Sequence, residues 1–433
     1  MLLSEYFIPV LKENPKEAEI KSHNLMIKSG MISQHVSGIY HWLPLGVRVI
    51  DKITNIIRKH LAKNNILEIT TPYLQNAALW RSSNRYDSYG KEMMKLQDRH
   101  GQELILGPTN EEVITDIAKK FFLSYKNLPK ILYQIQWKFR DEIRPRFGVL
   151  RGREFLMKDA YSFDYDFESS MITYSKIFQI YNEIFDEMGL NIIAAEADSS
   201  EIGGKVSHEF HILSDIGESE IYFDKNILDL KIDQKKYLDF YSSFYSKTSE
   251  LGKTEENKKE FFHSKSIEVG QIFNFDTKYS KKMDAKFTNK EGHNSHFFMG
   301  SYGIGISRLV AAAIEENSDE NSITWPKKLS PFQVSLINLE QNNSRVVEIS
   351  DNLYKMLQSY NIEVLYDDSL KQAGYKLKFH HLIGFPLQII VSSKLISKNY
   401  VECIFKRENI SHKIEIGNFE KFIKSNLNDL VKI

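Results

Sequence analysis

The chain has 433 residues, and its 57 Lys and Arg balance 57 Asp and Glu, so the formal net charge is zero. This balance excludes a strongly basic surface built for nonspecific nucleic-acid binding, and the single cysteine, Cys403, excludes a disulfide framework. No apolar run approaches the roughly 18 residues that cross a bilayer, and acidic residues stand where an N-terminal targeting peptide would be positive. We therefore expect a cytoplasmic protein of two or three domains with no membrane partner.

The composition and hydrophobic pattern of the sequence divide the chain into blocks. Residues 1–223 alternate amphipathic helices with short strands, whereas 224–265 are rich in Lys, Asp, Ser and Tyr and predict a small polar insertion or a mobile excursion. A further block, 331–433, follows Pro326 and Pro331. In it, strands expected over 332–339, 362–366, 387–392 and 401–405 alternate with helices expected over 342–360, 372–382 and 419–430. This alternation predicts a compact α/β domain.

A helix followed by a strand is expected in the first block. Gly46 opens the helix, and the strand over 66–71 ends at Pro72. The apolar residues of the helix repeat at helical spacing: Val47, Ile50, Ile53, Ile57 and Leu61. By itself this pattern is typical of an amphipathic helix packed on a sheet.

A hairpin rich in arginine is expected over 131–158. Apolar and polar residues alternate from Ile131 to Arg140, which predicts a strand with one polar face, and Glu142 lies just beyond its end. A turn and a return strand over 151–158 follow. Residues 138–158 hold seven Lys or Arg and three acids, and guanidinium groups match phosphate oxygens bidentately. The pattern favours a polyphosphate site, and a solvated basic hairpin is the simpler alternative.

A glycine-led helix is expected near residue 306. Gly300, Gly303 and Gly305 precede an apolar, Ala-rich run with Arg308 in its first turn. Glycines let a backbone approach a ligand closely, and a helix N-terminus with an arginine attracts anions. The resemblance to a dinucleotide fingerprint is weak because Arg308 occupies the third glycine position, and helix packing could also explain the glycines.

Jointly, and in this order, these patterns resemble the three signature motifs of class II aminoacyl-tRNA synthetases. Residues 46–72 resemble motif 1, residues 139–142 with 151–155 resemble motif 2, and residues 303–308 resemble motif 3. Finer matches resemble the prolyl-tRNA synthetase family: Gly107-Pro108-Thr109-Asn110-Glu111-Glu112, Gly203-Gly204 with Ser207-His208-Glu209-Phe210, and Val269-Gly270-Gln271-Ile272-Phe273.

The resemblance implies an α+β fold, with a class II synthetase-like antiparallel sheet flanked by helices. The catalytic domain would consist of 1–223 and 266–330 around the insertion 224–265, followed by an α/β anticodon-binding domain over 331–433. The implied activity is a ligase that uses ATP and Mg to attach L-proline to tRNA(Pro) through a prolyl-adenylate, as a homodimer. Between Asp159 and Gly300 there is too little room for the family's large editing domain, so we expect a form without it.

The resemblance also implies the site residues. Arg140 and Arg308 would be catalytic. The implied ATP-binding residues are Arg140, Glu142, Arg151, Phe155, Glu268, Gln271 and Arg308. The implied proline-binding residues are Thr109, Glu111, Arg140, His208, Phe273 and Ser301. The protein itself would hold no metal apart from Mg with ATP. Separately, the cluster of Lys371, Lys376 and Lys378 near the Asp367-Asp368 turn indicates anticodon contacts, with a solvated helix as an equal alternative.

Departures from the family pattern and rival interpretations remain. Asp276 stands where the family usually has Gly, Gln271 where it often has His, and Ser369 where Arg is expected. The main alternative is a catalytically silent class II paralogue that acts as a nucleic-acid-binding or regulatory subunit, although such a chain should have lost its phosphate-binding arginines. A threonine enzyme is disfavoured because its substrate zinc would need a cysteine, and Cys403 lies in the wrong domain.

Overall fold

The structure, a computed structural model, describes residues 1–16, 18–198, 206–252 and 261–430. The chain divides into two compact units. Unit 1 comprises Met1–His35, Tyr40–Ile53 and Ala313–Ile433, and unit 2 comprises Val36–Ile39 and Thr54–Ala312. The expected α+β fold is confirmed, because unit 2 holds a mainly antiparallel sheet flanked by helices and unit 1 holds a smaller mixed sheet. No helix in the described part of the chain has the length and apolar character needed to cross a membrane.

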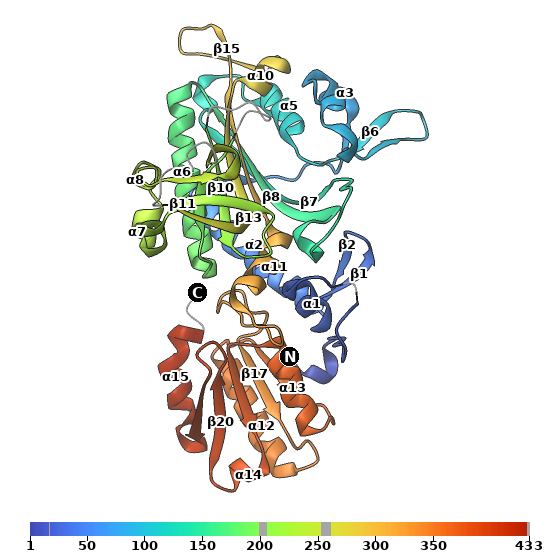
Figure 1. Cartoon of the computed structure of the whole chain (residues 1–433), viewed down its shortest axis with the longest axis vertical. Helices are drawn as coiled ribbons and strands as arrows, with labels where there is room; N and C mark the ends of the chain where they lie inside the picture. Colours follow the sequence, from blue (N-terminus) through green and yellow to red (C-terminus); the bar gives the residue numbers. More distant parts are fainter. Residues whose placement is uncertain (17, 199–205, 253–260, 431–433) are drawn as a thin grey trace. The chain divides into compact units, whose positions relative to one another are not determined.

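The main sheet of unit 2 has nine strands among the described residues, in the order β10-β9-β12-β11-β13-β16-β8-β7-β3. Figure 1 labels β7, β8, β10, β11 and β13 of this sheet. Its four central strands pair antiparallel: β13 (Phe261–Asp276), β16 (Phe298–Gly305), β8 (Glu154–Asp164) and β7 (Lys130–Phe139). β7 and β8 form the predicted hairpin. The return strand begins at Glu154 rather than at Arg151. The short helix η4 (Gly148–Leu150) lies in the turn, and Arg151 after it forms an isolated bridge with Arg146 instead of joining β8.

The remaining strands of this sheet flank these four. They are β3 (Leu67–Glu68), which pairs parallel with β7, and β9 (Ile193–Glu196), β10 (Val206–Leu213), β11 (Ser219–Asp224) and β12 (Ser246–Thr248). The segment 224–265 supplies β12 and the first residues of β13. It also holds η5 (Lys225–Asp229), α7 (Ile232–Lys235), α8 (Leu238–Tyr241) and α9 (Ser249–Gly252), while 253–260 lie outside the described residues.

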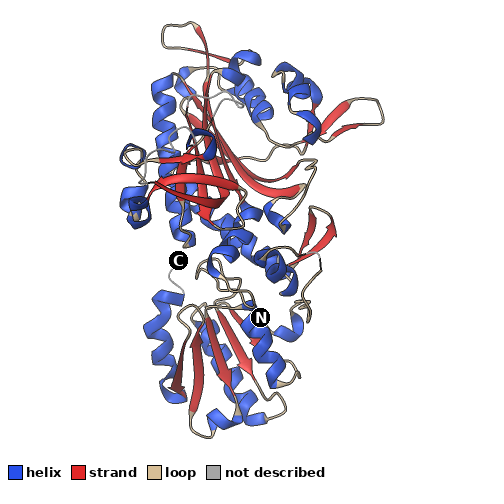
Figure 2. Ribbon diagram, in the orientation of Figure 1, coloured by secondary structure: helices blue, strands red, loops and turns tan. Residues whose placement is uncertain are grey.

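Helices cover the two faces of the sheet differently (Figure 2). Helix α6 (Phe167–Met188) lies along one face, with Tyr174, Phe178 and Tyr181 fully buried against it. Because side chains alternate between faces along a strand, the row Phe155, Met157, Asp159, Tyr161 and Phe163 of β8 lies on the opposite face, which we call the site face. Helix α5 (Glu111–Phe121) covers one end of the site face, where Ile114 and Ala118 pack against Phe163, Phe273 and Met299.

Short elements complete unit 2. They are α3 (Ala77–Ser82), α4 (Arg85–Ser88), η2 (Gly90–Glu92), η3 (Tyr125–Asn127), α10 (Lys278–Lys282), the β14–β15 hairpin (Lys286–Thr288 and Asn294–His296), and a three-stranded sheet of β4 (Leu74–Asn76), β6 (Glu103–Leu106) and β5 (Lys95–Gln97). Helix α2 (Pro44–Lys63) begins two residues before the predicted start, with proline at a position where its missing N–H is tolerated. Helix α11 (Ile306–Asn317) follows β16 directly.

Unit 1 contains the predicted C-terminal α/β arrangement. Its sheet has the order β18-β17-β19-β20-β21: Val364–Asp367, Val334–Asn338, Leu387–Val391, Tyr400–Phe405 and Ile410–Glu415. Its helices are α12 (Ser344–Ser359), α13 (Ala373–Ile383), α14 (Ser393–Ile396) and α15 (Phe419–Leu430). Leu336, Val346, Ile389 and Phe419 belong to its core. The sequence analysis missed β21, whose residues are mostly exposed and lack an apolar alternation.

The N-terminal segments of unit 1 are η1 (Leu3–Glu5), α1 (Lys21–Lys28) and the hairpin strands β1 (Ile32–Val36) and β2 (Ile39–Trp42). The Met1 ammonium donates to the Val364 carbonyl at 3.0 Å, and Leu2 forms an isolated bridge with Tyr366 of β18. The first residues of the chain therefore contact β18, at the edge of the C-terminal sheet.

Candidate active site

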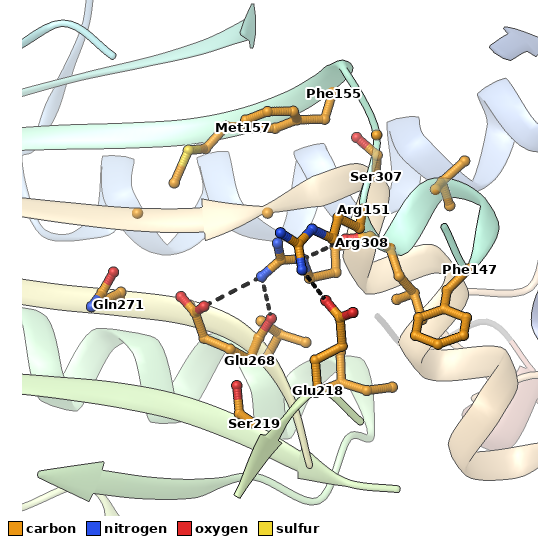
Figure 3. Close-up of a pocket in the computed structure, with 18 of the residues that line it drawn as sticks. Phe147, Arg151, Phe155, Met157, Glu218, Ser219, Glu268, Gln271, Ser307 and Arg308 are labelled. Carbon is orange, nitrogen blue, oxygen red and sulfur yellow. Dashed lines mark hydrogen bonds and ion pairs between the residues drawn. The ribbon is translucent and has the colours of Figure 1, made fainter. Parts of the chain in front are cut away.

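A cavity of about 400 Å³ lies on the site face of unit 2 (Figure 3). Strands β8, β13 and β16 form its floor, and η4 and the start of α11 contribute to its wall. Gly303 and Gly305 of β16 line it, and a Cβ at Gly303 would collide with the Met157 methyl group. Glycine therefore keeps the floor open at this point. All seven residues predicted to bind ATP line this cavity: Arg140, Glu142, Arg151, Phe155, Glu268, Gln271 and Arg308.

Arg140 follows β7 directly and lies over the Phe155 ring, with 5.1 Å from its Cζ to the ring centroid. Its Nη2 is 3.4 Å from the Pro108 carbonyl, beside the Thr109 loop. Its Nε is buried and has no hydrogen-bond partner among the described residues. Buried polar groups are usually satisfied, so this guanidinium is available to a ligand.

Arg151 is held between two carboxylates. Its Nε donates to Glu142 at 2.8 Å, and its Nη1 donates to Glu218 at 3.1 Å. The hydrogen bond from Arg151 holds the pKa of Glu142 below its usual range. Glu218, in the turn before β11, also pairs with Arg146. The sequence analysis missed Glu218, because no local pattern indicates a contact with residues about 70 positions earlier.

Arg308, in the first turn of α11, contacts main-chain and side-chain oxygens. Its Nη1 donates to the Glu268 carbonyl at 2.8 Å and lies 3.4 Å from the Glu268 carboxylate, and its Nε donates to the Leu150 carbonyl at 3.0 Å. Burial raises the pKa of Glu268, and the nearby charge of Glu209 adds to that effect. Figure 3 shows the Arg151 and Arg308 side chains pointing into the cavity, with Glu218 and Glu268 facing them.

The residues predicted to bind proline meet in part. Thr109 Oγ1 donates to Glu111 Oε2 at 2.6 Å, and Ser301 Oγ donates to Glu111 Oε1 at 3.3 Å. Phe273 lies opposite Ser301 in the register of β13 and β16, on the site face. The contact from Arg140 to Pro108 connects this group to the cavity.

Arg85 and Glu112 are two further residues of this group that no sequence motif indicated. Arg85 Nη1 contacts both Glu111 and Glu112. Burial alone would raise the pKa of Glu111, but the Arg85 charge and the Thr109 hydroxyl outweigh it, so the pKa lies below its usual value. Burial and the Glu111 charge raise the pKa of Glu112, against the effect of Arg85. The two neighbouring carboxylates are therefore driven in opposite directions.

The structure does not place His208 beside Thr109, Glu111 and Ser301. In the pairing of β10 with β13, His208 lies opposite Ile272, so both point to the face covered by α6. There the His208 ring shares a hydrogen bond of 2.7 Å with the Tyr174 hydroxyl and packs against Phe178. Burial lowers the pKa of His208 to about 4. Gly203 and Gly204, which belong to the same predicted motif, lie outside the described residues.

Three lysines that the sequence analysis counted in the hairpin's basic excess or assigned to the anticodon are buried. Lys138 lies on the site face, but it pairs with Asp159 at 3.0 Å and is fully buried. Lys158 points to the α6 face, where burial lowers its pKa to about 7. In α13, Lys376 is also fully buried, because its ammonium lies 3.3 Å from Asp367 and donates to a main-chain carbonyl. Lys376 therefore cannot contact an anticodon, whereas Lys371 and Lys378 are exposed.

The departures from the family pattern have structural settings. Asp276 has φ +55 at a bulge in β13, a left-handed conformation that glycine adopts most easily and aspartate tolerates. Gln271 lines the cavity and donates to Glu209 at 3.1 Å. The hydroxyl of Ser369 donates to Asp367 at 2.7 Å.

The donor set of the cavity fits a cation that arrives with a nucleotide. Among the described residues, no group of three or more His, Cys, Asp or Glu side chains is arranged to hold a metal ion alone. Glu218 and Glu268 nevertheless present carboxylates to the cavity. Magnesium usually binds one or two carboxylates together with phosphate oxygens and water, so these residues suit magnesium bound to a triphosphate.

Two family models match the chain. The tRNA synthetase class II core domain (G, H, P, S and T) matches residues 94–317, and the anticodon binding domain matches residues 333–426. The first match covers the main sheet apart from β3, together with the arginine-lined cavity, and the second covers the α/β sheet of unit 1. Fold, site and family models together define a class II aminoacyl-tRNA synthetase.

Curated relatives and solved structures narrow the class. The proline--tRNA ligase of Rickettsia africae is 50% identical over 422 residues, which cover 96% of this chain and 99% of that protein. The proline--tRNA ligase of Rickettsia bellii is 52% identical over 404 residues, which cover 93% of this chain and 94% of that protein. The chain belongs to the proline--tRNA ligase family. A Giardia lamblia prolyl-tRNA synthetase in complex with prolyl-adenylate has the same fold, with a TM-score of 0.76 at 18% identity over 94% of this chain and 77% of that one.

Proposed function

We propose that the chain activates L-proline with ATP and transfers the prolyl group to tRNA(Pro). The observation that carries this proposal is the convergence of Arg140, Arg151 and Arg308 on one cavity, with Arg140 also contacting Pro108, just before Thr109 and the start of α5 at Glu111. Polyphosphate and amino acid would thus bind on either side of one guanidinium. Names of close relatives and the family models support the same reaction.

The first step is an attack by the proline carboxylate on the α-phosphate of ATP, which forms prolyl-adenylate and releases pyrophosphate. Arg140 would contact the carboxylate and the α-phosphate, and Arg308 the γ-phosphate. Because no bond to the protein forms, positioning and charge stabilisation would supply most of the rate acceleration. Glu268 and Glu218 would hold Mg with ATP, and that ion would neutralise phosphate charge.

The substrate ends would be held by the flanking groups. Phe155 would stack on the adenine, with Glu142 and Arg151 at the adenine end and the triphosphate. Glu111 would accept hydrogen bonds from the proline ammonium, since a buried cation without a counter-ion is costly. Thr109, Ser301 and Phe273 would complete this pocket. His208 is not part of this proposal, because it lies on the α6 face.

In the second step, the anticodon-binding domain would recognise tRNA(Pro) with its exposed surface, including Lys371 and Lys378.

We also propose a homodimer in the cytoplasm. Support for a partner surface comes from exposed apolar side chains on β3 and at the start of β4: Leu67, Tyr73 and Leu74. Strand β3 is an edge strand, and exposed edges tend to be paired or covered.

The test is amino-acid-dependent exchange of pyrophosphate into ATP, measured for each of the twenty amino acids. We expect exchange with proline well above exchange with every other amino acid, with weak exchange for alanine. A catalytically silent paralogue would bind ATP without exchange for any amino acid. That result, or a clear preference for another amino acid, would reject the proposal.

A further inference from the structure

A buried group of charges lies at the start of α5. Figure 1 shows this helix beside α3 and α10. Arg85 is the first residue of α4, and its Nη1 lies 3.2 Å from Glu111 Oε2 and 3.1 Å from Glu112 Oε1. Glu112 is fully buried, and Glu111 is nearly so. One guanidinium nitrogen therefore serves two neighbouring carboxylates, of which only Glu111 has a role in the proposed reaction.

Hydroxyl groups complete the contacts of both carboxylates. Thr109 and Ser301 donate to the two oxygens of Glu111, and Ser83 Oγ donates to Glu112 at 2.7 Å. Aromatic rings from three elements lie under the guanidinium, with 5.0 to 5.5 Å from Cζ to the ring centroids: Trp80, Tyr89 and Tyr279. Such an arrangement fixes the direction of Arg85 as well as its charge.

Other titratable groups facing the cluster come from β7, β8, α10 and the end of α4. Lys138 pairs with Asp159, and burial lowers the pKa of Lys278. Burial raises the pKa of three tyrosines so that they stay neutral: Tyr89, Tyr161 and Tyr279. Among the described residues, Arg85 is the cation whose hydrogen bonds reach both Glu111 and Glu112.

We propose that Arg85 is a positioning residue that keeps Glu111 ionised and oriented toward the substrate ammonium. It does so by balancing the charge of the neighbouring carboxylate, Glu112. Two carboxylates this close together cannot both ionise cheaply. Without Arg85 they would share a proton at neutral pH, as close acid pairs do, and that proton would compete with the ammonium of proline. This inference rests on the proposed function, because it assigns Glu111 to the proline nitrogen.

The test compares Arg85→Met with Arg85→Met/Glu112→Gln, using KM values from pyrophosphate exchange between pH 6.5 and 8.5. In Arg85→Met we expect KM for proline to rise roughly 100-fold at pH 7 and to fall again as the pH is raised, while KM for ATP changes less than about threefold. Removing the second acid should recover roughly tenfold, because no partner is left to share a proton with Glu111.

A purely structural role for Arg85 predicts a different result. It would raise both KM values without a pH trend, and Glu112→Gln would then add damage instead of relieving it; either outcome would overturn the inference. Should Arg85→Met be unfolded by circular dichroism, the comparison passes to Arg85→Lys with and without Glu112→Gln. The effect of Glu112→Gln on KM for proline is then measured in two backgrounds, Arg85→Lys and the wild-type chain. The inference requires that the substitution lower this KM at least about threefold more in Arg85→Lys than in the wild-type chain. Equal effects in the two backgrounds reject the inference.

Failure of the proposed function can be recognised separately with Glu111→Gln. If the wild-type chain shows no proline-dependent exchange, or if Glu111→Gln leaves KM for proline unchanged, the assignment of Glu111 is rejected. If Glu111→Gln weakens proline binding while the Arg85 variants show neither the pH trend nor the rescue, only the inference about Arg85 is rejected.

Discussion

At the scale of single residues, the environment of a side chain decides its role more than its type does. Arg140 lies over Phe155 with an unsatisfied Nε, whereas the cation only two residues before it, Lys138, is buried in an ion pair with Asp159. The sequence places both in one polar row. It cannot tell which of them is covered, because Asp159 comes from the neighbouring strand.

Arg140→Ala should lower the rate of proline-dependent pyrophosphate exchange by about 100-fold or more, because removing one preorganised donor to a developing charge typically costs that much. Circular dichroism should show an unchanged fold. Arg99→Ala is the matched control, since Arg99 is an exposed arginine of the same unit. Near-normal exchange in Arg140→Ala would contradict the assignment.

His208 makes stability depend on pH. Burial lowers its folded-state pKa to about 4, against about 6.5 for an ordinary histidine. Above pH 6.5 both states are neutral and the contribution to stability is fully present. As the pH falls from 6.5 towards 4, the unfolded state binds a proton that the folded state resists, so the free energy of unfolding decreases by about 2 kcal/mol between pH 7 and pH 5.

His208→Gln should remove this decrease and leave KM for proline unchanged, because the side chain lies on the α6 face. Urea unfolding at pH 7 and pH 5 measures the difference, with the exposed His100→Gln as control. An equally steep loss of stability in His208→Gln would contradict the burial argument. A large rise in KM for proline would contradict the position of His208.

At the scale of elements, periodicity predicted β7 and its partner β8 well, because alternation depends only on local geometry. Strand ends were less accurate where a short helix such as η4 intervenes. In α13 the sequence shows two lysines, Lys376 and Lys378, but only the packed helix shows that Lys376 points inward to Asp367. Whether a helix side chain points toward a covered face depends on distant chain segments, so it could not be predicted.

The two faces of β16 give a paired prediction for its glycines. Gly303 lines the cavity, and a new Cβ there would meet the flexible end of Met157; Gly300 faces the other way, against the Tyr302 ring and Ser162. Gly303→Ala should raise KM for ATP or proline roughly tenfold, equivalent to about 1.4 kcal/mol, with little loss of stability.

Gly300→Ala should instead lower the free energy of unfolding by about 1–3 kcal/mol, the usual cost of overpacking, with KM values little changed. Kinetics and urea unfolding of both variants form one experiment, in which each variant is the control for the other. If both variants lose stability equally and bind substrates equally well, the assignment of the two faces is wrong.

At the scale of the whole molecule, the chain covers nearly the full length of its relatives. The described helices and strands between β8 and β16 are α6, strands of the main sheet, η5, the short helices α7 to α9, α10 and the β14–β15 hairpin. Motif order predicted the class, because catalytic chemistry constrains those residues together. Glu218 and Arg85 escaped prediction, because their partners lie in other elements.

A proline-sized pocket should not strongly reject alanine, since a missing methylene is worth only about 1–3 kcal/mol, or roughly 10- to 200-fold. We expect the purified chain to form Ala-tRNA measurably and not to hydrolyse it, because the segment between motifs 2 and 3 is too short for a full editing domain. Charging with labelled alanine, followed by deacylation of supplied Ala-tRNA, measures both steps. Rapid deacylation by the chain alone would contradict this prediction.

The carboxylates of Glu142, Glu218 and Glu268 contact Arg151 and Arg308. A polyanion gains little from approaching a surface whose charges already cancel, so a strand of RNA has weak electrostatic reason to enter this cavity before ATP does. A triphosphate with its metal ion is compact enough to exchange with the acidic side chains one contact at a time. We therefore expect an order of arrival at the cavity in which the nucleotide precedes the 3′ end of the RNA.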